Sequence, residues 1–145
     1  MFPHSLIVVA SALSALALAV PTGAQANVSC GRNVFATAQV TAAVDDGYQR
    51  VKDNRIIDRT YPKAYRNTDR LSMACGGNSM FEFPLVAGGR AFTGGDPGPD
   101  RVIFNESRIL CAVITHSGAP GNTFVSCKVF TFPSVQIAPW TVTSG

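Results

Sequence analysis

The four cysteines of this chain constrain its fold more than any other feature. They are Cys30, Cys75, Cys111 and Cys127, and all of them follow a 26-residue N-terminal segment that contains no Lys, Arg, Asp or Glu. An even number of cysteines in a small secreted chain predicts two disulfides, for which three pairings are open. A zinc site is the alternative, but no two cysteines have C-x-x-C spacing and only one histidine follows residue 26.

The N-terminal segment is the reason to expect export. An apolar block at residues 6–20 is followed by the small-x-small triplet Ala24-Gln25-Ala26. This is the pattern of a secretory signal peptide, and we expect cleavage after Ala26. A transmembrane anchor would need about 20 apolar residues. We therefore expect a secreted, extracellular protein that makes no membrane contact.

The 119 residues after the predicted cleavage site are enough for one domain and too few for two. Apolar or small residues recur with helical spacing over residues 37–51. Four short runs with strand-like composition follow, separated by loops rich in glycine and proline: 80–86, 101–105, 110–116 and 123–130. This order predicts an α+β fold in which one helix packs on a short antiparallel β-sheet.

His116 is the first candidate for proton chemistry, because it is the sole histidine after the predicted cleavage site. It ends an apolar run, so a packing role with a satisfied hydrogen bond is the competing interpretation. The chain carries 12 basic and nine acidic residues, a net charge of +3. This mild positive charge permits a nucleic-acid ligand without requiring one.

Glu82 and Arg101 are the next candidates. If the run at residues 80–86 alternates as a strand, Phe81, Phe83 and Leu85 share one face and Glu82 lies on the other. Glu82 is then either a solvent-facing residue or a carboxylate placed for a function. Arg101 starts a strand, where it can hold a phosphate or pair with a neighbouring carboxylate on the surface.

Four segments carry a more specific signal when they are taken together. They are YPKAYRN at 61–67, FEFP at 81–84, GPDRVIFN at 98–105 and ITHSGAPGNTFVSC at 114–127. In order and spacing they resemble the small fungal guanyl-specific ribonucleases of the ribonuclease T-one family, over residues 30–127. The resemblance implies an endoribonuclease that uses no metal or other cofactor. Such an enzyme cleaves single-stranded RNA 3′ of guanosine, by transesterification to a 2′,3′-cyclic phosphate followed by hydrolysis.

The resemblance also implies catalytic roles for individual residues. Glu82 matches the general base, which takes the proton of the 2′-hydroxyl, and His116 matches the general acid, which protonates the departing 5′-oxygen. Arg101 and Tyr61 match groups that stabilise charge on the phosphate, and Phe124 matches an aromatic side chain that packs beside it. A carboxylate and an imidazolium on opposite sides of phosphorus suit an in-line displacement.

Guanine recognition is implied for a second set of residues. Tyr65 matches the residue that stacks on the base. Asn67 and Asn122 match residues that hydrogen-bond to its edge or support it, and Asp69 matches the acceptor for its N1 and N2 groups. Stacking is worth about 1–3 kcal/mol and tolerates any base. Specificity is therefore expected to depend on Asp69 and the loop backbone.

The resemblance further implies the domain organisation. It pairs Cys30 with Cys127, the bridge that ties the ends of the domain, which leaves Cys75 to pair with Cys111. We expect a signal peptide at 1–26, a monomeric ribonuclease domain at 27–127 and a C-terminal extension at 128–145. The extension is interpreted as either an additional edge strand or a loosely packed tail.

The sequence departs from the family pattern at the site. Lys63 replaces a second histidine that assists the carboxylate base, and an ammonium is a poor proton acceptor near neutral pH. Arg66 and Thr68 replace an asparagine and an aromatic lid, which weakens the prediction of strict guanine preference. We expect an active but weakened ribonuclease. The alternative is a catalytically weak, secreted effector that binds RNA on the same fold; a ribotoxin ranks third because long basic loops are absent.

Overall fold

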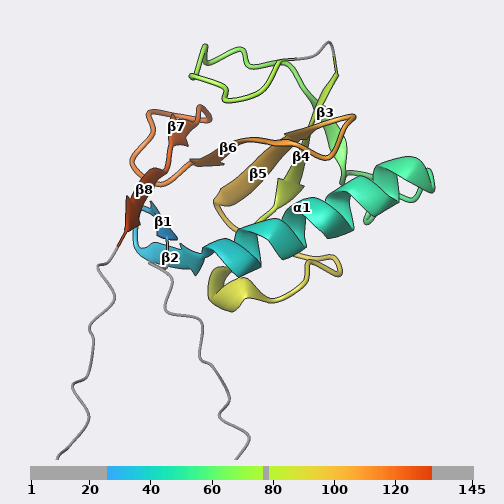
Figure 1. Cartoon of the computed structure of the whole chain (residues 1–145), viewed down its shortest axis with the longest axis horizontal. Helices are drawn as coiled ribbons and strands as arrows, with labels where there is room; N and C mark the ends of the chain where they lie inside the picture. The colour runs from blue at the N-terminus through green and yellow to red at the C-terminus, as the bar shows by residue number, and fades with distance from the viewer. Residues whose placement is uncertain (1–25, 77–78, 132–145) are drawn as a thin grey trace, which may run out of the picture.

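A computed structural model describes residues 26–76 and 79–131. The described residues form one α-helix, α1 (Thr37–Lys52), and eight strands arranged in two sheets. The larger, antiparallel sheet has the order β3 (Lys63–Tyr65), β4 (Met80–Pro84), β5 (Asp100–Asn105), β6 (Leu110–Thr115) and β7 (Val125–Ser126). The smaller sheet has the order β2 (Asn33–Ala36), β1 (Ala26–Cys30) and β8 (Lys128–Thr131). Figure 1 shows the helix on one face of the large sheet, so the predicted α+β fold is confirmed.

The small sheet differs from the sequence-based expectation in two ways. The hairpin of β1 and β2 precedes the helix, whereas all strands were expected after it. The run at 123–130 is two strands, β7 and β8, which are separated at Cys127. Because β8 pairs with β1, the sheet continues four residues beyond the expected domain end at 127. Residues 1–25 of the predicted signal peptide and residues 132–145 of the predicted extension lie outside the described residues.

The helix lies unusually close to the sheet at Gly47. Val40, Val44 and Gly47 form its buried stripe, as the spacing predicts. A Cβ atom at Gly47 would lie 2.8 Å from Cε1 of Phe104 and 3.0 Å from Cβ of Phe83. The helix can therefore reach this position only because residue 47 has no side chain.

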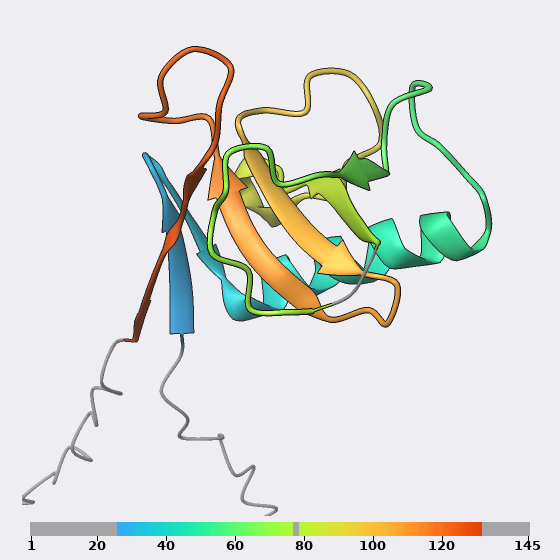
Figure 2. The ribbon, with the colours of Figure 1, turned by 90° about the horizontal axis from the view of Figure 1, so that it is seen from above.

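Strand β5 separates two hydrophobic layers. Val102 and Phe104 pack with Val40 and Val44 in the core between sheet and helix. Ile103 lies in a second core on the opposite face, with the buried residues Tyr65, Cys111 and Ile114. Within residues 26–76 and 79–131, no helix covers this second face. Figure 2 shows the segment of residues 66–76 passing across it, and Leu71 and Met73 of that segment pack against the second core.

Two disulfides crosslink the fold, and both have the pairing that the resemblance implies. Cys30–Cys127 joins β1 to the residue between β7 and β8. Cys75–Cys111 joins the 66–76 segment to β6.

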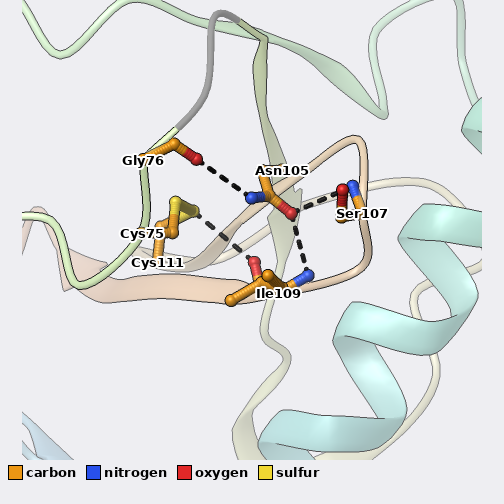
Figure 3. The surroundings of a disulfide bond; sticks show 6 residues. All are labelled: Cys75, Gly76, Asn105, Ser107, Ile109 and Cys111. Carbon is orange, nitrogen blue, oxygen red and sulfur yellow. Dashed lines mark hydrogen bonds between the residues drawn. A yellow bond between two sulfur atoms is a disulfide. The ribbon is translucent and has the colours of Figure 1, made fainter.

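Hydrogen bonds reinforce the second disulfide. Asn105 Nδ2 donates to the carbonyl of Gly76 at 3.1 Å, and Asn105 Oδ1 accepts from Ser107 N at 3.0 Å and Ile109 N at 2.9 Å (Figure 3). Ala74 N also donates to the carbonyl of Cys111 at 2.8 Å. The far end of the 66–76 segment is thus tied to both β5 and β6.

The double substitution Cys75→Ser and Cys111→Ser should lower the free energy of unfolding by about 2–4 kcal/mol, because it releases a loop of 36 residues in the unfolded chain. Urea denaturation followed by circular dichroism measures this loss. An unchanged midpoint would contradict the assigned role of the bridge.

Gly47→Ala should destabilise the protein by about 1–3 kcal/mol through overpacking, although alanine favours a helix by about 1 kcal/mol over glycine. The matched control is Ala42→Gly at an exposed position of the same helix, which measures the propensity effect alone. A Gly47→Ala protein that is more stable than the wild type would show that the helix does not need this close approach.

Candidate active site

A polar groove of about 310 Å³ opens beside the 66–76 segment. It is bounded by β3, β4, the start of that segment and the loop before β7. Its lining consists of Lys63, Ala64, Tyr65, Arg66, Asn67, Thr68, Asp69, Glu82, Asn122 and Phe124. Three stretches of chain that are far apart in sequence therefore meet at one surface.

Glu82 is a buried carboxylate at the floor of this groove. Strand pairing sets Lys63 opposite Glu82, and Lys63 Nζ lies 3.2 Å from Glu82 Oε1. Arg101 Nε, from β5, lies 3.7 Å from the same oxygen. The Glu82 and Arg101 side chains are 6% and 5% exposed, whereas Lys63 is 49% exposed. The interpretation of Glu82 as a solvent-facing residue is therefore wrong.

Two buried polar atoms at this centre lack hydrogen bonds. Among the described residues, neither Glu82 Oε1 nor Arg101 Nε has a hydrogen-bond partner. Arg101 is nevertheless held firmly, because its Nη1 donates to the carbonyls of Gly98 at 2.7 Å and Asp100 at 2.8 Å. A buried unsatisfied polar atom costs about 1–3 kcal/mol. An acceptor and a donor left without hydrogen bonds in a buried site call for an explanation, such as a functional role.

The ring of Tyr61 lies against both cations. Its centroid is 5.4 Å from Lys63 Nζ and 5.2 Å from Arg101 Cζ, within the range of cation–π attraction. Tyr61 is buried and packs edge-on against Phe92 at 5.7 Å. A single aromatic ring thus helps to hold the two positive groups near Glu82.

His116 follows β6 and has a defined tautomer. Its Nδ1 lies 2.7 Å from the carbonyl oxygen of Thr123. Because a carbonyl oxygen only accepts, Nδ1 must carry a hydrogen, which leaves Nε2 as the atom for proton transfer. The Phe124 ring stacks on the imidazole, with centroids 3.7 Å apart. The histidine is therefore held on its edge by a hydrogen bond and on its face by an aromatic ring.

The predicted base-binding residues line the same groove. Burial, with smaller contributions from Asp69 and Glu82, raises the pKa of the Tyr65 phenol to about 12, so the phenol stays protonated. Asn67 closes a local turn, because its Oδ1 accepts from Leu71 N and its Nδ2 donates to the carbonyl of Leu71, both at 2.8 Å. Asp69 Oδ2 accepts from the backbone N–H of Phe124 at 3.0 Å.

The structure brings all ten predicted site residues together. Seven line the groove: Lys63, Tyr65, Asn67, Asp69, Glu82, Asn122 and Phe124. The other three each contact one of these, as Tyr61 contacts Lys63, Arg101 contacts Glu82 and His116 contacts Phe124. The backbone carbonyl of Thr123, which holds His116, could not be predicted from the sequence because it has no side-chain signature.

Two further observations concern ligands and membranes. Within residues 26–76 and 79–131, no group of three or more His, Cys, Asp or Glu residues is placed to hold a metal ion. In the same residues, no helix has the length and apolar character needed to cross a bilayer.

Comparisons with known proteins agree with this geometry. A family model described as ribonuclease matches residues 23–128. Guanyl-specific ribonuclease C2 of Aspergillus clavatus is 37% identical over 129 residues, which cover 86% of this chain and 97% of that protein. Guanyl-specific ribonuclease T1 of Aspergillus oryzae is 35% identical over 130 residues, which cover 88% and 99%.

A solved structure, the ribonuclease from Hericium erinaceus, matches with a TM-score of 0.53 and 30% identity. The match covers 70% of this chain and 98% of that one. The family model and the relatives span the helix, the large sheet and every residue of the groove. The chain therefore belongs to the ribonuclease family that includes the fungal guanyl-specific ribonucleases.

Proposed function

We propose that this protein is a secreted endoribonuclease that cleaves single-stranded RNA 3′ of guanosine. The observation that carries the proposal is the buried carboxylate of Glu82, whose Oε1 has no hydrogen bond in the described structure and lies between Lys63 and Arg101. His116, whose Nε2 has no hydrogen bond among the described residues, lies near the same groove through its contact with Phe124. The relatives named as guanyl-specific ribonucleases support the same activity.

The first step is a transesterification. Glu82 accepts the proton of the 2′-hydroxyl, and the 2′-oxygen forms a bond to phosphorus while the bond from phosphorus to O5′ breaks. His116 donates the proton of Nε2 to O5′, which leaves as a hydroxyl. The products are a 2′,3′-cyclic phosphate and a free 5′-hydroxyl, with Glu82 protonated and His116 neutral.

The second step restores both groups. His116 takes a proton from water, the water oxygen bonds to phosphorus, and the bond from phosphorus to O2′ breaks. Glu82 returns its proton to O2′. The product is a 3′-phosphate, and no other reactant is consumed.

Arg101 and Lys63 supply the charge that the transition state needs. Arg101 Nε is a buried donor that is ion-paired with Glu82 but makes no hydrogen bond within the described residues. In such a site a fixed positive group stabilises developing negative charge more strongly than it would in water. Lys63 attracts the phosphate, and Tyr61 holds both cations in place. In this role Lys63 contributes a positive charge and not a proton acceptor, so Glu82 works without an assisting base.

Base recognition is assigned to other residues that line the same groove. Tyr65 stacks on guanine, and Asp69 has one oxygen, Oδ1, without a hydrogen bond in the described structure to accept from N1–H and N2–H. Asn67 keeps the loop closed, and Asn122 also lines the groove.

We also propose cleavage of a signal peptide after Ala26, export to an oxidising compartment that suits the two disulfides, and a monomeric state.

A guanosine-containing dinucleoside phosphate tests the activity directly. The wild type should form the 2′,3′-cyclic phosphate, and His116→Ala and Glu82→Gln should each lower kcat by about 10²–10⁴, because each removes one proton-transfer group. Chromatography of the products gives the rates. If the wild type is no faster than both variants and still binds RNA, the protein is the catalytically weak effector instead.

Lys63→His should raise kcat, because a neutral imidazole beside Glu82 can accept a proton and an ammonium cannot. Lys63→Gln is the matched control, since it removes the charge without adding a base. Steady-state rates at neutral pH compare the three proteins. A Lys63→His rate no higher than that of the wild type would exclude this explanation of the departure from the family pattern.

A further inference from the structure

One peptide group contacts both halves of the site. The carbonyl oxygen of Thr123 accepts from His116 Nδ1–H at 2.7 Å, and the N–H of Phe124 donates to Asp69 Oδ2 at 3.0 Å. These two atoms belong to the same amide, between residues 123 and 124, which is planar and rigid. The proton donor and the base-recognition carboxylate are therefore joined through a single stiff unit.

The side chain of Phe124 adds a second connection to His116. Its ring stacks on the imidazole at 3.7 Å and 25°, so the residue that bonds to Asp69 through its backbone also covers the face of the histidine. The position of this one residue sets two contacts of the general acid. A shift of Phe124 would disturb the hydrogen bond and the stacking together.

The loop that carries this amide is held at its end by packing and strand pairing, because Phe124 packs against the second core and Val125 pairs with Thr115. Thr123 N and Oγ1 both donate to the carbonyl of Pro120, and Ala119 N donates to the carbonyl of His116, all within the loop. In the described part of the chain, the bond to Asp69 is the hydrogen bond that ties residues 118–124 to a distant segment. Asp69 thus adds a hydrogen bond from outside the loop directly to the Thr123–Phe124 amide.

We propose that Asp69 is a positioning residue for the general acid as well as the acceptor for the base. This inference rests on the proposed function. One oxygen of the carboxylate holds the amide that orients His116, and Asp69 also lines the groove where the base is recognised. Contacts that strengthen in the transition state raise kcat. A base that engages Asp69 therefore stabilises the loop on which proton donation depends, and guanine recognition contributes to kcat as well as to KM.

The leaving group separates the two roles of Asp69. A nucleoside leaving group, as in guanylyl-cytidine, needs a proton on O5′. A p-nitrophenyl ester of guanosine 3′-phosphate has the same base, but its leaving group departs as a stable anion. Weaker base binding affects both substrates by the same factor, whereas a misplaced His116 affects mainly the nucleoside substrate.

The experiment measures kcat and KM on both substrates for the wild type, Asp69→Ala and Asp69→Asn. Asp69→Ala should lower kcat on guanylyl-cytidine by about tenfold more than on the nitrophenyl ester. Asp69→Asn keeps an oxygen that can accept from Phe124 N–H, so its loss should be equal on the two substrates. His116→Ala provides the reference for a missing acid. Equal losses for Asp69→Ala would overturn the proposal.

A structural readout keeps the test independent of activity. In the NMR spectrum of the wild type, the ring of Phe124 should shift the His116 Hε1 signal away from its ordinary position. Asp69→Ala should largely remove this shift, and Asp69→Asn should retain it. If Asp69→Ala does not fold, Asp69→Ser replaces it, because the serine side chain is shorter than that of aspartate. If the His116 signal is unchanged in the variant that lacks the carboxylate, the positioning role of Asp69 is refuted, whether or not the wild type is active. If the wild type cleaves neither substrate, the proposed function is refuted separately.

Discussion

The structure depends on one constraint: α1 can cover only one face of the large sheet, while β5 is buried on both. The second face must be covered by the 66–76 segment, which contains no helix or strand. Such a segment keeps a fixed shape only where it is tied down. Cys75–Cys111, the Asn105 amide and the packing of Leu71 and Met73 provide these ties. The groove lies beside this segment, between its first residues, β3, β4 and the loop before β7.

The same arrangement explains why the site is both polar and buried. Glu82, on the face opposite Phe83, is enclosed by β3 and β5, and its charge is balanced by Lys63 and Arg101. Replacing such buried ion pairs with apolar groups is often neutral or stabilising. Glu82 Oε1 and Arg101 Nε make no hydrogen bond within the described residues, which adds a further cost. A stable fold does not need this cluster, so its presence is best explained by the reaction.

Much of the fold could be predicted from local patterns, and the exceptions have physical causes. The spacing of Val40, Val44 and Gly47 located the helix to within one residue, and β4, β5 and β6 lie within the expected runs or within one residue of them. The hairpin of β1 and β2 was missed because its strands have five and four residues, too few to show a period.

The sequence could predict which side chains form the site, but not their contacts or the backbone groups that hold them. A motif can place Glu82, His116 and Arg101 in the sequence, but the position of the Tyr61 ring against both Lys63 and Arg101 results from strand pairing. Backbone groups such as the Thr123 carbonyl leave no trace in residue identity. Electrostatic and hydrogen-bonding details of this kind require the folded chain.

The Cys30–Cys127 bridge also has a mechanical consequence. Because β1 and β8 lie side by side, both ends of the described chain emerge from the same end of the molecule (Figure 2). Tension applied to the two ends separates β8 from β1, and the covalent bond then carries the load. Everything between the two cysteines, including the helix and the groove, is shielded from the pull. Such a domain can be tethered or dragged by its termini without distortion of its reactive surface.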